Sequence, residues 1–325
     1  MKSKVLAAFS SSEKTRAYEL LAARVAHMMG RKFEEGDWSH VYCSAKGIPD
    51  RGWSNLNIDV AFGSLGVEHK MLMRPVDKPI TTWCGTTLMH PAATRAIRID
   101  SLAGDPNKVM RDVFKQYADL IERRVEKIRQ SALGKVPDMR TGWLLWQEGL
   151  REFVYFEERM LAPDPILYKA SWNERSGGGG RLGSKNLWIY EKATGKKRFS
   201  VTTQAGIKIQ PYFDVPSVDD PNLYVFVAQG ERTADGLVRV WLTESTARAL
   251  SSLLGSLDTT AVSKAILSVK AAPGSVGEVL AAEPAREVLV EGEAYAHLRT
   301  TLKGVSDEHS FRLLLDLLAA DKKRR

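Results

Sequence analysis

The 325 residues of this chain suffice for one large domain or two of ordinary size, and a hydrophobic fraction of 44% supplies a core without disulfides. Two cysteines with no nearby Cys or His partner exclude a disulfide framework and a zinc site. No apolar run is long enough to span a bilayer, and the first residues lack a signal-peptide layout, so we expect a cytoplasmic protein with no membrane association. A formal net charge of +8 favours a polyanionic partner.

The first predicted element is a helix from Ser12 to Met29. Its apolar stripe includes Tyr18, and Gly30 provides the stop signal. The stretch that follows is irregular in pattern, with one predicted strand at His40–Ser44. Acidic residues in this stretch are interpreted as members of a surface loop.

The stretch from Asn57 to Leu72 organises the N-terminal half of the chain. Residues 57–62 alternate polar and apolar side chains, a period of two that predicts a strand. A turn with a glycine at each end then allows an antiparallel return through residues 67–72. The same alternation places Glu68 and Lys70 on one face of the second strand. We therefore expect Asp59, Glu68 and Lys70 to lie close together.

Two carboxylates beside an ammonium group are costly to bring together unless a ligand needs them. Mg²⁺ is such a ligand, because it prefers oxygen donors and is commonly held by one or two carboxylates, with water and substrate phosphate completing the octahedron. Lys70 would then orient or help to deprotonate a metal-polarised water and offset charge at the phosphate. The alternative interpretation is an ordinary hairpin with a charged, solvated face.

Asp59, eight intervening residues and then Glu68-His69-Lys70 between apolar flanks resemble the PD-(D/E)XK nuclease superfamily, and restriction endonucleases in particular. Ile58 stands where the motif name has proline, a position at which the superfamily often lacks proline. The resemblance covers about residues 55–73. It implies that Asp59 and Glu68 bind the metal and that Lys70 is the motif lysine. It also implies that Glu19, from an early helix, joins the metal cluster; the alternative is a solvated helix glutamate.

The remainder of the first half contains a loop, two helices and a short strand. Asp105 and Pro106 open a long helix that reaches about Gln130, and its basic face, which includes Arg124, is predicted to be solvated. Residues 142–146 are predicted to form a buried strand, and residues 150–161, which resume helical spacing, a helix. We expect an α/β nuclease domain over residues 1–161, built as a mixed sheet flanked by helices as the resemblance implies.

The second half is β-rich and then helical. The predicted strands cover residues 167–171, 186–190, 198–203, 207–210, 222–228 and 237–242. The clearest predicted helices cover residues 245–254, 261–270 and 311–318. Residues 162–325 are therefore expected to form a region for DNA recognition or an accessory role.

A basic segment surrounds the Gly177–Gly180 run. Between Glu174 and Ser200, seven Lys and Arg residues stand against two acidic residues. A flexible loop of this charge is suited to close approach to a duplex, although a plain connection has the same composition. The predicted DNA-binding residues are Arg175, Arg181, Lys185, Lys197 and Arg198.

The function expected from these features is a Mg²⁺-dependent, site-specific endonuclease of double-stranded DNA, similar to a type II restriction enzyme. Family analogy also suggests a homodimer, since palindromic sites are cut on both strands. Two alternatives remain open: a DNA-binding protein without catalytic activity, and a repair-type nuclease with little sequence preference.

Overall fold

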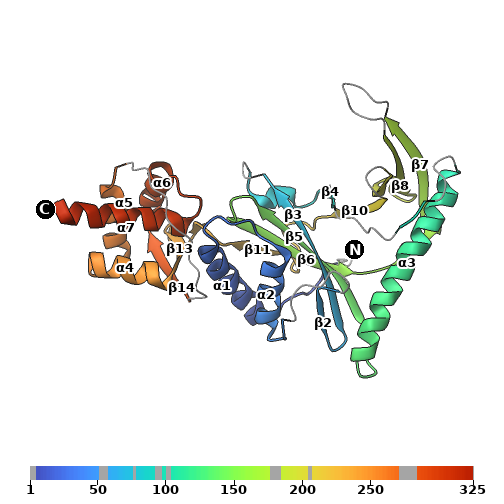
Figure 1. Cartoon of the computed structure of the whole chain (residues 1–325), viewed down its shortest axis with the longest axis horizontal. Helices are drawn as coiled ribbons and strands as arrows, with labels where there is room; N and C mark the ends of the chain where they lie inside the picture. Colours follow the sequence, from blue (N-terminus) through green and yellow to red (C-terminus); the bar gives the residue numbers. More distant parts are fainter. Residues whose placement is uncertain are drawn as a thin grey trace.

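A computed structural model of the chain describes residues 5–50, 58–75, 78–91, 97–99, 104–175, 184–203, 207–270 and 284–324. The mixed α/β class is confirmed: helices flank three sheets, and the C-terminal end is helical (Figure 1). Among the residues so described, no helix combines the length and apolar character needed to cross a membrane.

The central sheet carries the candidate site. Its strands in spatial order are β1 (Val5–Leu6), β6 (Glu152–Arg159), β5 (Asp138–Gln147), β3 (Leu65–Arg74) and β2 (Val60–Phe62), with β11 (Tyr224–Val227) also paired to β6. Strands β3 and β5 are parallel, and the other pairs are antiparallel. Parallel neighbours need a long crossover, which here includes helix α3 (Pro106–Ser131).

Two N-terminal helices, α1 (Ser11–Met28) and α2 (Glu35–Lys46), contribute to the core on one face of this sheet. The expected first helix is confirmed by α1. The expected strand at His40–Ser44 is wrong, because these residues lie within α2. Its buried side chains follow the spacing i, i+3, i+4 and i+7, which is helical: Trp38, Val41, Tyr42 and Ala45.

The expected helix at residues 150–161 is also wrong, because most of this stretch is strand β6. Phe153 and Tyr155 join the core beneath α1 and α2, whereas Val154 and Phe156 join a second core on the opposite face. A strand covered on both faces is apolar at successive positions, and it therefore lacks the alternation that identifies a strand in sequence.

A second, antiparallel sheet contains the basic segment. Its order is β4 (Thr87–Met89), β10 (Lys208–Asp214), β9 (Lys197–Thr202), β8 (Ser184–Glu191) and β7 (Tyr168–Arg175), and the short 3-10 helices η1 (Ile80–Trp83) and η2 (Pro165–Leu167) precede β4 and β7. The first half of α3 packs on one face of this sheet through Val109, Val113 and Phe114. Farther along, Ile121 and Ile128 of α3 pack against Ile58 and Met139 beside the central sheet. Helix α3 thus joins the two sheets.

The C-terminal residues form a unit with a core of their own. It contains β12 (Glu231–Arg232), β13 (Val238–Thr243), α4 (Glu244–Leu254), α5 (Thr259–Ser268), β14 (Ala285–Val290), α6 (Gly292–Thr301) and α7 (Asp307–Arg324). This unit contacts the rest of the chain at α1, where the Tyr18 hydroxyl donates to Glu231 at 2.6 Å and accepts from the Trp241 indole at 3.2 Å. The expected boundary at residue 161 does not coincide with a break in packing, since β10 and β11 pair with strands from the first half.

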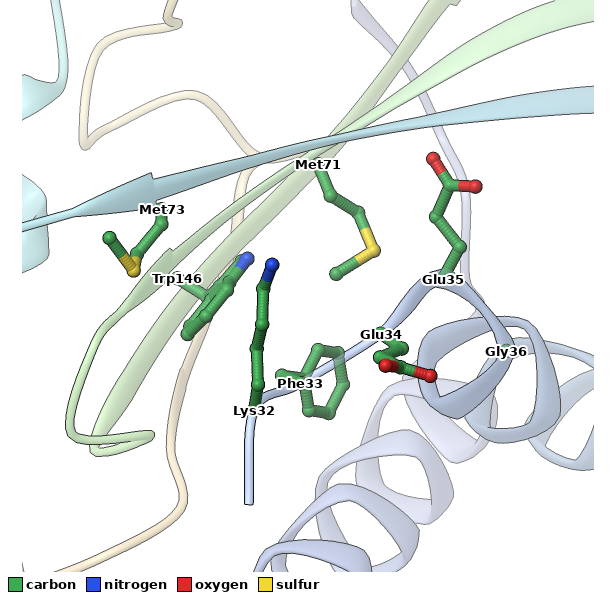
Figure 2. A pocket seen from close by; sticks show the side chains of 8 residues that line it. All are labelled: Lys32, Phe33, Glu34, Glu35, Gly36, Met71, Met73 and Trp146. Carbon is green, nitrogen blue, oxygen red and sulfur yellow. The ribbon is translucent and has the colours of Figure 1, made fainter. Parts of the chain in front are cut away.

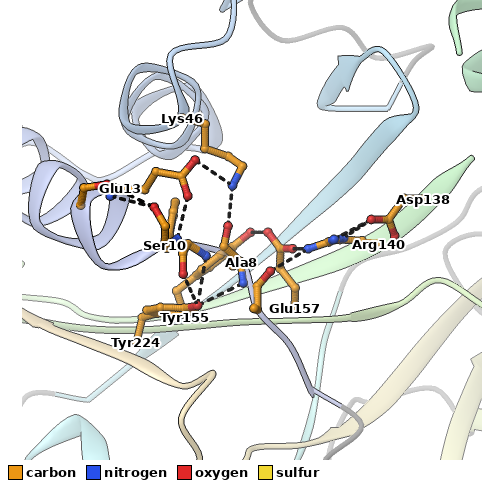
Figure 3. A network of polar contacts seen from close by, with 12 residues as sticks. Ala8, Ser10, Glu13, Lys46, Asp138, Arg140, Tyr155, Glu157 and Tyr224 are labelled. Atoms are coloured by element: carbon orange, nitrogen blue, oxygen red, sulfur yellow. Dashed lines mark hydrogen bonds and ion pairs between the residues drawn. The ribbon is translucent and has the colours of Figure 1, made fainter. Parts of the chain in front are cut away.

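A buried polar network holds the N-terminal segment against the central sheet (Figure 3). Glu157, fully buried, accepts from the Tyr155 hydroxyl at 2.8 Å and from Arg140 at 2.8 Å. Arg140 also donates to the carbonyl oxygen of Ala7 at 3.0 Å. The Tyr224 hydroxyl accepts from the backbone N–H of Ala8 at 3.1 Å. These bonds fix the approach of the chain to α1.

Candidate functional site

The hairpin of β2 and β3 positions the candidate site. Val60 lies opposite Val67, and both side chains enter the core beneath α1 and α2. Extending the register by one residue places Asp59 opposite Glu68. A carboxylate oxygen of Asp59 accepts a hydrogen bond of 2.6 Å from the backbone N–H of His69, which ties the residue before β2 to β3. The expected pairing of these two acids across the hairpin is therefore present in the structure.

Glu68 is the most constrained acid of the site. It is 7% exposed, and its Oε1 atom accepts from Lys70 Nζ at 2.5 Å and from Arg124 Nη2 at 3.0 Å. Its Oε2 atom is buried and has no hydrogen-bond partner within the described ranges. An unsatisfied buried carboxylate oxygen is costly, so this atom is the strongest indication of a missing ligand.

Arg124 was not expected in the site. Its side chain is only 26% exposed, whereas the basic face of this helix was predicted to be solvated. Helix α3 crosses β3 so that Ile128 lies beside Gly66, and the residue one turn earlier, Arg124, reaches Glu68. The sequence contains no local signal for this contact, because it depends on the crossing of two distant elements.

The electrostatics of the site are dominated by negative charge. Burial, and after it the charge of Glu68, raises the pKa of Asp59 to about 7. The hydrogen bond from His69 and the charge of Lys70 lower this pKa only in part, and the charge of Glu35 raises it further. A cation between Asp59 and Glu68 would offset both the cost of burying the Asp59 charge and its repulsion by Glu68, and would lower this pKa.

Glu35, rather than Glu19, is the glutamate of the early helices whose charge raises the pKa of Asp59. It opens α2, and Figure 2 shows its carboxylate directed towards β3. Glu19 lies on α1 with an exposed side chain and is not among the main groups that shift the pKa of Asp59. The acids near Glu35 were interpreted as loop residues because α2 itself was not predicted. The sequence signal that could have identified Glu35 is the preference for acidic residues in the first turn of a helix.

A pocket of about 540 Å³ adjoins the site along β3. Its walls include Phe33, Met71, Met73 and Trp146, and Lys32 and Glu35 lie on its polar side (Figure 2). Met71 and Met73 alternate with Lys70 along β3, so the pocket lies on the face of the strand opposite Glu68 and Lys70.

The residues present fit a hydrated Mg²⁺ ion better than a transition metal. Asp59 and Glu68 supply two carboxylates, one of which has the unsatisfied Oε2 atom. No group of three or more His, Cys, Asp or Glu side chains suitable for a metal occurs in the described part of the chain. His69 is fully buried beside Trp38 and Tyr42, and its pKa is lowered to about 3, first by burial. A two-carboxylate site leaves water and phosphate to complete the coordination, as Mg²⁺ requires.

Four of the predicted DNA-binding residues belong to strands of the second sheet, separate from the hairpin. Lys185 pairs with Glu174 at 2.6 Å, and Lys197 lies over the ring of Trp188 at 3.5 Å. Arg198 is 15% exposed and pairs with Glu191 and Asp214. Arg175 ends β7, but its side chain and all of Arg181 lie outside the described residues. Contact of these residues with DNA remains a prediction.

No family model, curated protein or solved structure matches this chain. The resemblance of the hairpin to PD-(D/E)XK nucleases therefore stays an interpretation of residues 55–73, and the case for a function depends on the geometry of Asp59, Glu68 and Lys70.

Proposed function

We propose that this chain is a Mg²⁺-dependent, site-specific endonuclease of double-stranded DNA, similar to a type II restriction enzyme of the PD-(D/E)XK superfamily. The observation that carries the proposal is the buried Glu68 with an unsatisfied Oε2 atom, next to Asp59 and Lys70. The net charge of +8 supports a nucleic-acid substrate. We further propose that the enzyme acts in the cytoplasm as a homodimer, one copy for each strand.

Asp59 and Glu68 would hold the metal. Bound Mg²⁺ supplies Lewis-acid chemistry, since it polarises a phosphoryl oxygen and lowers the pKa of a coordinated water. Lys70, whose ammonium lies 2.5 Å from Glu68 Oε1, is placed to orient the attacking water and to offset the charge that develops on the phosphate. Arg124 donates to the same oxygen at 3.0 Å and thereby fixes the carboxylate plane, with Oε2 left for the cation.

The proposal is tested by incubating the protein with supercoiled plasmid and Mg²⁺, with and without EDTA. We expect discrete fragments that require Mg²⁺. Glu68→Gln should lower the rate by at least about 100-fold, since a metal site contributes several kcal/mol to the transition state. Binding to duplex DNA should survive, because phosphate contacts from Lys and Arg are made elsewhere.

Glu19→Gln is the matched control, since it removes one carboxylate from an exposed position on α1. This variant should cleave at the wild-type rate. Wild-type cleavage by Glu68→Gln would overturn the assignment of the site. A smear instead of fragments would indicate a nonspecific nuclease, and intact but shifted plasmid would indicate a binding protein without catalytic activity.

A further inference from the structure

The second sheet has one face that carries aromatic side chains outside the hydrophobic cores. Leu187, Ile189 and Val201 face α3 and are fully buried. Trp188 of β8 and Tyr212 of β10 are only half-buried, and neither belongs to a hydrophobic core of the described residues. Alternation along a strand places Trp188 on the face opposite α3.

Trp188 and Tyr212 converge on one cation above the strand between them. Lys197 Nζ lies 3.5 Å from the ring centroid of Trp188 and 5.1 Å from that of Tyr212. Trp188 lies opposite Ser200 of β9, a small residue that leaves the space between the two rings to Lys197. Burial, and after it the charge of Tyr190, raises the pKa of Tyr212.

The surplus of positive charge on this sheet favours an anionic ligand. Strands β7 to β10 contain six Lys and Arg residues against three Asp and Glu residues. All three acids are already paired: Glu174 with Lys185, and Glu191 and Asp214 with Arg198. A cationic guest is disfavoured by this surplus and by the ammonium of Lys197 between the rings. An anionic chain that carries flat rings is complementary to both features.

We propose that the face formed by Trp188, Lys197 and Tyr212 binds an unpaired stretch of nucleic acid. On binding, the Lys197 ammonium leaves the ring of Trp188 and pairs with a phosphate, and bases stack on the faces of Trp188 and Tyr212. An intact duplex does not fit, because its base faces are covered by their neighbours in the stack. The inference goes beyond the proposed cleavage reaction, since it concerns a separate surface and needs no metal.

The experiment measures fluorescence anisotropy of a labelled oligo-dT strand with the whole protein in EDTA, beside a labelled duplex of mixed sequence. Trp188→Ala and Tyr212→Ala should each weaken oligo-dT binding by about 10- to 100-fold, the range for loss of one stacked base. Trp188→Phe, which keeps a ring, should recover most of the affinity. Duplex binding should change by less than about threefold, because stacking on a ring contributes nothing to phosphate contacts.

Trp83→Ala is the control, since Trp83 is another half-buried tryptophan with a cation over its ring, Arg74 at 3.4 Å. Its oligo-dT affinity should match the wild type. The proposal is overturned if Trp188→Ala and Tyr212→Ala bind oligo-dT like the wild type, or if they lose as much affinity for the duplex as for oligo-dT. It is also overturned if the wild type sediments as a dimer and Trp188→Ala as a monomer. Glu68→Gln should retain oligo-dT binding, which separates this inference from the cleavage proposal.

Discussion

Asp59 changes its protonation near neutral pH because burial and the charge of Glu68 raise its pKa to about 7. In the unfolded chain an aspartate titrates near pH 3.9. Between these values the folded protein holds a proton that the unfolded chain has lost. Folding stability should therefore fall as the pH rises from about 4 to about 7 through this group.

Asp59→Asn should remove this dependence. At pH 8 the variant should exceed the wild type in free energy of unfolding by up to about 4 kcal/mol, since one pKa unit corresponds to about 1.4 kcal/mol. At pH 4 the two proteins should be nearly equal. Urea unfolding in EDTA at both pH values measures the difference. His69 and His90, which burial also perturbs, are common to both proteins and cancel in this comparison. An equal difference at pH 4 and pH 8 would contradict the electrostatic picture.

Lys70 and Arg124 both donate to the Oε1 atom of Glu68. Substituting each in turn should distinguish a residue that takes part in cleavage from one that only positions Glu68. Lys70→Ala should slow cleavage by about 100-fold, the scale of losing one donor aimed at developing charge, with little change in Mg²⁺ affinity. Arg124→Ala should have a smaller effect, because Lys70 still holds Glu68. Calorimetric titration with Mg²⁺ provides the second readout. If Lys70→Ala lost metal affinity as strongly as activity, Lys70 would be a structural partner of Glu68.

Among the elements, the parallel pair of β3 and β5 fixes the site against the aromatic core. His69 of β3 lies opposite Gly142 of β5, and a Cβ atom at Gly142 would lie 2.8 Å from His69 Cδ2 and would also meet the Tyr155 hydroxyl. Only glycine leaves room for both side chains. The position of β3, and with it the direction of Glu68 and Lys70, depends on this close packing.

Gly142→Ala should destabilise the protein by about 1–3 kcal/mol, the usual cost of an added methyl group in a filled core. Gly36→Ala provides the control, because a Cβ atom there meets nothing within 4 Å in α2. Helix propensity alone should make that variant more stable by up to about 1 kcal/mol. Thermal unfolding of the two variants measures both effects. Equal stability of Gly142→Ala and the wild type would show that β5 shifts to accommodate the methyl group.

At the scale of the whole molecule, the chain forms a row of three bodies. The C-terminal unit, the central sheet with α1 and α2, and the second sheet lie along the long axis, with α3 beside the second sheet (Figure 1). The C-terminal unit has its own core and contacts α1 through Tyr18, Glu231 and Trp241. The folding stability of the C-terminal unit can therefore be measured separately from the strength of its contact with α1.

Tyr18→Phe should weaken that contact by about 1–2 kcal/mol, because one hydroxyl makes both the bond to Glu231 and the bond from Trp241. Limited proteolysis near residue 230 should become faster. Ser263→Ala is the control, since it removes a hydroxyl that accepts from the backbone N–H of Glu291 at 2.8 Å inside the C-terminal unit. That control should lose similar stability without faster cleavage near residue 230. Equal cleavage of both variants would contradict a specific role for Tyr18.

The sequence by itself determined the local elements that have a clear period or cap. The hairpin at Asp59–Lys70, the helix α1, and α3 with its Asp105 cap and Pro106 all follow from patterns within one turn or one strand. The net charge likewise indicated a polyanionic partner. These features are local because hydrogen bonding within an element and alternation of its faces involve only neighbouring residues.

Only the tertiary structure decided which distant side chains meet. Strand β6 is buried on two faces and therefore lacks the alternation that identifies a strand. In α2 the apolar residues do have helical spacing, but buried Asp37 and Ser39 interrupt the apolar pattern. The effect of the Glu35 charge on Asp59, and the contact of Arg124 with Glu68, follow from how α2 and α3 pack on β3. Crossings depend on packing between elements far apart in the chain, which periodicity within one segment does not encode.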